Sequence, residues 1–120
     1  MEKRQLGTSG LQVSTLGLGC NNFGGRLDAA ASRAVIEKAL DLGVTHIDTA
    51  DIYPVSTTGD SETILGKALG KRRPDVVLAT KFGMAMDDSG RHGGSRHYIM
   101  TAVEDSLRRL QTDWIDLYYL

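Results

Sequence analysis

Residues 43–53 have the sequence Gly-Val-Thr-His-Ile-Asp-Thr-Ala-Asp-Ile-Tyr, in which a short, mostly β-branched segment leads directly into polar side chains. A glycine followed by such a segment, here residues 44–47, is typical of a buried β-strand. Asp48 and Tyr53 then lie just past the carboxyl end of that strand. Folds with parallel strands place their functional groups at these ends. The stretch therefore predicts an α/β fold with a functional site beside Asp48 and Tyr53.

The rest of the chain alternates between strand and helix patterns. A hairpin is predicted over residues 4–14, and strands over residues 15–19, 44–47, 76–80 and 114–120. Apolar residues at helical spacing predict three helices between these strands, with Asp28, Ser61 and Ser95 as N-caps. The glycines at positions 43 and 70 are natural helix stops. Single helices between consecutive strands predict parallel strands joined by crossover connections.

The composition limits the classes of protein to which the chain can belong. It has 120 residues, 41% of them hydrophobic, which is enough for the core of one domain. Lys and Arg number 14 and Asp and Glu number 15, so the net charge of −1 gives no basis for binding nucleic acid or an anionic membrane surface. The single cysteine excludes an internal disulfide and favours a reducing, cytoplasmic setting. No segment approaches the roughly 20 apolar residues of a membrane span.

Two architectures fit four parallel strands. An open, doubly wound sheet can be complete at this length, whereas a (β/α)8 barrel needs about 250 residues. A dinucleotide-binding open sheet requires the motif G-x-G-x-x-G after the first strand. Residues 17–22 are Gly-Leu-Gly-Cys-Asn-Asn, with asparagine at the position of the third glycine. A receiver-type sheet requires carboxylates at the same place. The sequence also stops on a strand with no covering helix, so we expect part of a barrel.

The order and spacing of several motifs resemble the N-terminal part of the aldo-keto reductase superfamily over essentially all 120 residues. Residues 43–53 resemble the superfamily's G-x-x-x-x-D-T-A-x-x-Y motif. Further similar segments are the hairpin at 6–14, the strand at 16–19, Ser61-Glu62 with residues 65–69, Ala79-Thr80-Lys81, and residues 104–110 followed by 113–118. The resemblance implies an α/β fold, the (β/α)8 TIM barrel of aldo-keto reductase type. Residues 1–120 are then the N-terminal half of a single barrel domain, with the hairpin, the first four strands and three helices.

Members of this superfamily reduce aldehydes and ketones with a nicotinamide cofactor, usually NADPH. The resemblance therefore implies an NADP-dependent oxidoreductase that acts on a small carbonyl substrate. It places Asp48, Tyr53 and Lys81 at three of the four catalytic positions. The fourth is a histidine just after the fourth strand, and the sequence ends at Leu120. We therefore expect a truncated chain that does not catalyse the reaction alone.

The chemistry of these residue types points the same way. Carbonyl reduction requires a hydride for carbon and a proton for oxygen. A phenol beside an ammonium group is a proton donor, because the positive charge favours the phenolate that remains. We expect Tyr53 to be the general acid, Lys81 to modulate it, and Asp48 to hold Lys81. Asp51 is the rival carboxylate, and we expect it to be less buried than Asp48 because it lies nearer the loop.

The loop after the first strand borders the nicotinamide and its ribose in the superfamily. By resemblance, Cys20, Asn21 and Asp48 are cofactor-binding residues, although Cys20 and Asn21 occupy positions where threonine and tryptophan are common. The residues that grip the cofactor phosphates lie mostly beyond the fourth strand in such enzymes. Arg108 and Arg109 are interpreted as a solvated helix face rather than an anion site.

The remaining polar residues suggest no further centre. His46 is interpreted as a packing residue within a strand, and His92 and His97 as surface residues rather than replacements for the fourth catalytic residue. No cysteine and histidine spacing fits a metal site, so no metal is expected.

Two alternatives stay open. The 120 residues could form a non-catalytic half-barrel whose open sheet edges lead it to self-associate or to require a partner. They could also belong to a cofactor-binding regulator on the same fold. The presence of Asp48, Tyr53 and Lys81 argues against a pure regulator, which has no need of a proton-donating device.

Overall fold

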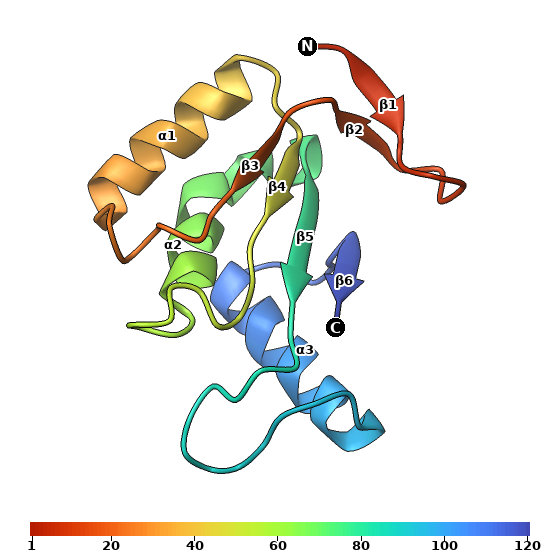
Figure 1. The fold of residues 1–120 in the computed structure, drawn as a ribbon. Helices are drawn as coiled ribbons and strands as arrows, with labels where there is room; N and C mark the ends of the chain where they lie inside the picture. The colour runs from red at the N-terminus through yellow and green to blue at the C-terminus, as the bar shows by residue number, and fades with distance from the viewer.

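Four parallel strands form the centre of the structure, a computed structural model that describes residues 1–120. They are β3 (Gly17–Gly19), β4 (His46–Asp48), β5 (Val77–Lys81) and β6 (Leu117–Tyr119), and they lie side by side in that order (Figure 1). Neighbours in sequence are thus neighbours in the sheet. This confirms the predicted parallel strands, each within the span of a predicted strand or within one residue of it.

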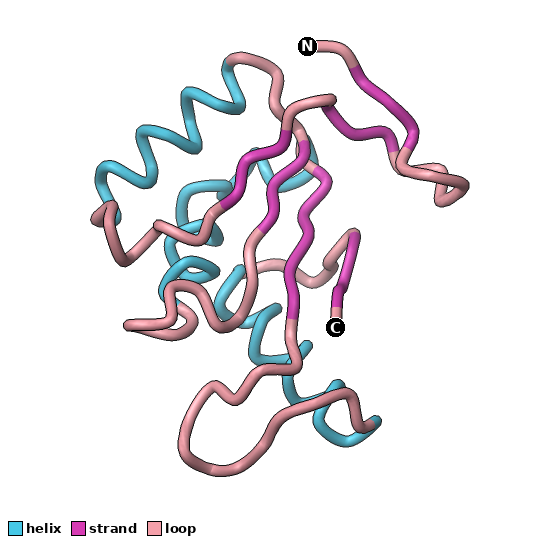
Figure 2. Tube along the Cα trace, viewed as in Figure 1, coloured by secondary structure: helices cyan, strands magenta, loops and turns pink.

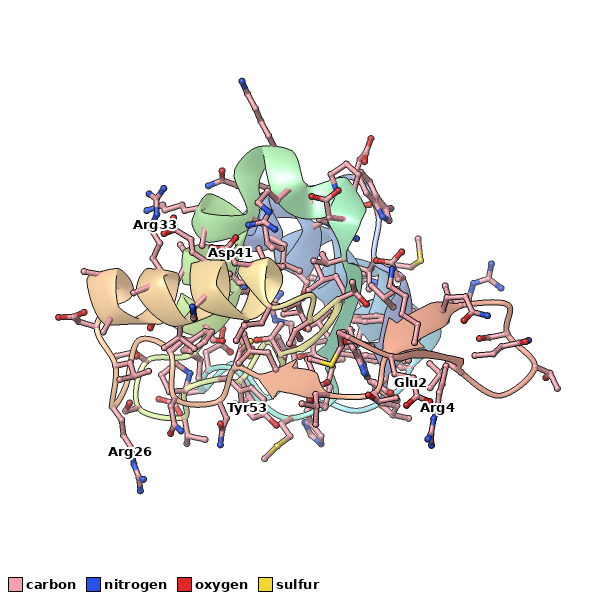
Figure 3. All side chains as sticks on the ribbon, turned by 90° about the horizontal axis from the view of Figure 1, so that it is seen from above. Glu2, Arg4, Arg26, Arg33, Asp41 and Tyr53 are labelled. Carbon is pink, nitrogen blue, oxygen red and sulfur yellow. The ribbon has the colours of Figure 1, made fainter.

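Three helices connect these strands, with an additional hairpin at the N-terminus. The helices are α1 (Ala29–Asp41), α2 (Asp60–Leu69) and α3 (Arg96–Leu110), and the 3-10 helix η1 (Gly70–Asp75) follows α2 directly. The hairpin pairs β1 (Lys3–Gln5) with β2 (Gln12–Ser14). Helix α2 packs between α1 and α3. Seen from above, α1 and α2 lie on one side of the strands, and the labelled Tyr53 lies on the other (Figure 3).

Two of the three predicted N-caps are confirmed. The side chains of Asp28 and Ser95 accept hydrogen bonds from backbone N–H groups in the first turns of α1 and α3. The prediction of Ser61 is wrong, because α2 begins at Asp60 after Gly59, whose φ of 89° is in the left-handed region. Ser61 instead lies in the first turn, where its buried hydroxyl donates to the carbonyl of Cys20. Gly43 has a φ of 85°, as a glycine past a helix end requires.

The core lies between the sheet and its three helices. It contains Ile36 of α1, Leu65 of α2, Leu110 of α3 and, from the strands, Ile47 and Leu78, all almost fully buried. Val35, an apolar residue of α1, is 38% exposed, whereas the polar Ser32 is fully buried on the adjacent face of the helix. The hydroxyl of Ser32 donates to the carbonyl of Leu27, which satisfies it inside the core.

The loops that follow β4 and β5 leave the sheet at the same end (Figure 2). The ladder continues into them, since the N–H of Thr49 donates to the carbonyl of Ala79 and that of Asp51 to the carbonyl of Lys81. In the register of the two strands, Asp48 lies opposite Ala79, two residues before Lys81. Residues two apart on a strand share a face, so Asp48 and Lys81 are brought to the same face of the sheet.

Candidate active site

Asp48 and Lys81 form a close ion pair at the carboxyl ends of β4 and β5. The ammonium nitrogen of Lys81 lies 2.8 Å and 2.7 Å from the two carboxylate oxygens of Asp48 and donates a third hydrogen bond to the carbonyl of Thr49 at 2.9 Å. All three protons of the ammonium therefore have acceptors. Both side chains are about one-third exposed, so the pair is held rigidly but is still open to a bound molecule.

Tyr53 lies beside this pair, at the end of a short turn. Its N–H donates to the carbonyl of Ala50 and its own carbonyl accepts from the N–H of Ser61, which fixes the backbone on both sides of the ring. The Lys81 nitrogen lies 5.1 Å from the centre of the Tyr53 ring and 6.0 Å from that of Tyr119, within cation–π range of both. The three residues predicted from the sequence are thus gathered at one end of the sheet.

A small, mostly apolar hollow opens next to Tyr53 and Lys81. Its volume is about 190 Å³, and the side chains of Phe82, Met84 and Leu120 contribute to its wall. A larger groove of about 810 Å³ lies against η1 and the C-terminal end of α3, with Arg73 and Trp114 in its lining. None of Asp48, Tyr53 and Lys81 lines this groove. The smaller hollow is therefore the one that can present a substrate to Tyr53.

The predicted cofactor residues after β3 separate into two kinds. The thiol of Cys20 is fully buried in the core, and burial is the main cause that raises its pKa above the ordinary value for cysteine. Asn21 is exposed beside it. Of the three predicted residues, Asn21 and Asp48 have accessible side chains, whereas that of Cys20 is closed off from a molecule bound at this end of the sheet.

Asp51 overturns one expectation, because its carboxylate is not solvated. The residue is 2% exposed, less than Asp48, since the chain continues along β5 for three residues beyond β4. Two causes raise the pKa of Asp51 from 3.8 to about 6. The larger is burial, and the second is the negative charge of Glu62. The guanidinium of Arg109 and the N–H of Ile52 act in the opposite direction. Asp51 is thus a buried acid that ionises close to neutral pH.

The variant Asp51→Asn should be more stable than the parent above pH 6. A native-state pKa of about 6 against 3.8 when unfolded means that the folded protein binds the extra proton, so the free energy of unfolding falls as the pH rises from about 4 to 6. Asparagine removes this dependence and should gain about 1–3 kcal/mol at pH 7–8 and little at pH 4. Urea unfolding at both pH values measures this. An equal effect at pH 4 and pH 8 would contradict the assignment.

Arg109 and Glu62 form a second ion pair that sequence patterns did not indicate. The Nε of Arg109 donates to a carboxylate oxygen of Glu62 at 2.7 Å, and Glu62 is fully buried. The prediction of a solvated face is therefore wrong for Arg109, although it holds for Arg108, which is exposed and pairs with Asp105. The nearest signal in the sequence is the acidic residue in the first turn of α2, but a charged residue there is equally typical of a solvated helix start.

The histidines do not join this arrangement. His46 begins β4 at the far end from Asp48, and its Nε2 is buried without a hydrogen-bond partner. His92 and His97 are exposed. No group of three or more histidine, cysteine, aspartate or glutamate side chains is arranged to hold a metal ion.

Comparison with known proteins supplies the family. The model of the aldo/keto reductase family matches residues 15–120, nearly the whole chain. The chain belongs to the aldo/keto reductase family. Its four strands and three helices are accordingly part of a (β/α)8 barrel, and the open-sheet interpretation is excluded.

The relatives that match this chain are much longer than its 120 residues. The chain is 46% identical to the uncharacterized oxidoreductase YqkF of Bacillus subtilis over 124 residues, which cover all of this chain and 39% of that protein. It is 37% identical to a probable voltage-gated potassium channel subunit beta of Arabidopsis thaliana, covering 99% of this chain and 37% of that protein. Among solved structures, the aldo-keto reductase AKR11C1 from Bacillus halodurans, in its holo form, matches with a TM-score of 0.86 and 49% identity, over 98% of this chain and 39% of that one. The aldo/keto reductase chain described here thus spans about two-fifths of the length of these relatives.

The helices of this aldo/keto reductase chain add one further finding. None of them combines the length and the apolar character that a membrane crossing demands.

Proposed function

We propose that the whole protein to which these residues belong reduces aldehydes or ketones to alcohols with NADPH, and that Tyr53 donates the proton. The observation that carries the proposal is the fully hydrogen-bonded Lys81 ammonium, held by Asp48 within 5.1 Å of the Tyr53 ring centre. A fixed positive charge beside a phenol is what a tyrosine needs to act as an acid at neutral pH. Residues 1–120 as the N-terminal half of one barrel, and a cytoplasmic location, belong to the same proposal.

The backbone at the end of β3 is open next to Asp48. Gly19 pairs with Asp48 in the register of the sheet, and no atom lies within 4 Å of the place where a side chain of residue 19 would begin. A molecule can therefore approach the backbone closely at this point. Asn21 and Asp48 offer an amide and a carboxylate that can bind the carboxamide or ribose hydroxyls of a nicotinamide nucleotide.

In the proposed reaction the residues of this chain handle the proton. When bound, the nicotinamide supplies a hydride to the carbonyl carbon. Tyr53 donates its phenolic proton to the carbonyl oxygen as negative charge develops there. Lys81 stabilises the resulting phenolate, and Asp48 keeps Lys81 in place through both of its oxygens. The apolar side chains that line the hollow beside Tyr53 limit the access of water to the reacting group when a substrate fills it.

The test is carbonyl-dependent oxidation of NADPH by the whole protein, expressed from its complete gene. A panel of aliphatic and aromatic aldehydes and ketones should give turnover with at least one member, and NADPH should give a higher kcat/KM than NADH. Binding of NADPH without oxidation by any member of the panel would instead favour the cofactor-binding regulator.

A self-associating half-barrel stays the alternative for residues 1–120 when they are produced alone. Strands β3 and β6 each leave one edge of the sheet without a neighbouring strand. Open edges favour pairing with a second chain. Size-exclusion chromatography of this segment should show oligomers if the alternative holds, and a folded monomer would count against it.

A further inference from the structure

Two consecutive residues of α2 make hydrogen bonds to the residues next to Asp48 and Lys81. They are Ser61 and Glu62, in the first turn of the helix. Their partners are Thr49, which directly follows Asp48, and Thr80, which directly precedes Lys81. All four side chains are fully buried. The helix side of the sheet is thus connected to the ion pair at two points.

The hydrogen bonds of Ser61 have a fixed direction. Its hydroxyl donates its single proton to the carbonyl of Cys20 at 2.7 Å. Thr49, whose hydroxyl lies 2.9 Å from that of Ser61, must therefore be the donor in the contact between them. Thr49 also contributes the carbonyl that accepts from the Lys81 ammonium. Ser61 therefore fixes two segments. One is the end of β4, where the carbonyl of Thr49 accepts from Lys81, and the other is the loop after β3, which it holds through the carbonyl of Cys20.

Glu62 acts in the same way on β5. One carboxylate oxygen accepts from the hydroxyl of Thr80 at 2.6 Å, and the other accepts from Arg109 of α3 at 2.7 Å. Successive side chains on a strand point to opposite faces. A hydrogen bond that holds Thr80 toward α2 therefore directs Lys81 to the other face, where Asp48 lies.

We propose that Ser61 and Glu62 are positioning residues, which set the relative placement of Asp48 and Lys81 from the helix side of the sheet. The role of the ion pair in carbonyl reduction rests on the proposed function, whereas the placement itself does not. This gives a physical reason for two polar residues, one of them charged, in the buried first turn of a helix. Burial of a carboxylate is costly unless it is fully paired, and here both oxygens are used.

Thr80→Val is the variant that tests the proposal with the smallest disturbance. It keeps the branched shape of the side chain and removes only the hydroxyl that binds Glu62, while the Glu62–Arg109 pair is left in place. Thr80→Ser restores the hydroxyl. Asp116→Asn is the control for general loss of stability. Asp116 accepts from Arg73 and from the N–H of Leu78, in a largely buried ion pair that involves no residue of the site.

Two measurements on the whole protein then decide. The first is the rate at which Lys81 is acylated in competitive labelling, relative to the exposed Lys3. Thr80→Val should raise this ratio several-fold, because the ammonium is less firmly held, while Thr80→Ser and Asp116→Asn should match the parent. The second is carbonyl reduction, for which Thr80→Val should lower kcat about tenfold with little change in the KM of the carbonyl substrate. Thr80→Ser should restore it.

The two measurements separate the positioning role from the proposed function. If the parent reduces no carbonyl compound, the proposed function fails, and the labelling ratio alone still decides whether Thr80 and Glu62 place Lys81. Parent-like labelling in Thr80→Val would overturn the positioning role. An equal rise in Asp116→Asn would overturn it too, because the effect would then be one of stability alone.

Discussion

The Tyr53→Phe variant of the whole protein is expected to reduce carbonyl substrates about a thousandfold more slowly than the parent, the middle of the range for loss of a general acid. Phenylalanine keeps the ring, and with it the contact to the Lys81 ammonium at 5.1 Å, but cannot donate a proton to the carbonyl oxygen. The tyrosine hydroxyl makes no hydrogen bond within the chain, so the fold loses nothing else. Single-turnover oxidation of bound NADPH measures the effect, with the affinity for NADPH expected to be unchanged.

Tyr119→Phe provides the matched control. Tyr119 lies on β6 with its ring centre 6.0 Å from the same ammonium, so the two tyrosines share a neighbour and differ in the proposed role. Removal of the Tyr119 hydroxyl should change the rate of carbonyl reduction by no more than a few-fold. Equal losses in the two variants would show that proximity to Lys81, and not proton donation by Tyr53, determines the rate.

Arg109→Met should reduce the free energy of unfolding by about 3–5 kcal/mol, because it leaves the buried carboxylate of Glu62 without its cation. Methionine retains much of the apolar stem of arginine, so most of the loss is electrostatic. Urea or guanidinium unfolding of the whole protein measures it, by the shift of the transition midpoint.

Arg108→Met is the natural comparison for that variant. The adjacent arginine is exposed and pairs with Asp105 on the surface of α3, where an ion pair contributes about 0–1 kcal/mol. A loss in Arg108→Met as large as that in Arg109→Met would mean that both act through the helix as a whole and that the buried pair has no special weight.

The parts of this structure that follow from local chemistry were predictable. The capping side chains of Asp28 and Ser95, the glycine stops and the strand at residues 76–80 depend on neighbours within a few positions. The association of Asp48 with Lys81 was predictable for a different reason. Parallel strands bring their carboxyl ends together, and two separate segments that resemble the family, residues 43–53 and 79–81, contain the two residues.

Burial of polar residues was not predictable from the same patterns. Asp51, Ser61 and Arg109 were each interpreted as groups on loops, caps or surfaces. In the structure each of them is covered by an element distant in sequence: Asp51 lies under the continuing ladder with β5, Ser61 faces Thr49, and Arg109 reaches Glu62 across 47 positions. A period in one helix shows which residues share a face, but not which polar residue on that face will meet a partner.

The positioning role proposed for α2 depends on two of the polar residues whose burial local patterns do not predict. A serine and a glutamate near a helix start are typical of capping and of favourable interaction with the helix dipole. Here both are instead directed at the sheet, where they hold the two residues next to the ion pair. The first turn of α2 is therefore better described as part of the site than as the edge of the helix.

A double-mutant cycle measures most directly whether Tyr53 and Lys81 act as one proton-donating unit. The rates of carbonyl reduction are compared for the whole protein, Tyr53→Phe, Lys81→Met and the double variant. Residues that act as a unit give a double variant about as slow as the slower single variant. We expect this result. Losses that multiply, or a Lys81→Met variant that keeps the parent rate, would contradict it.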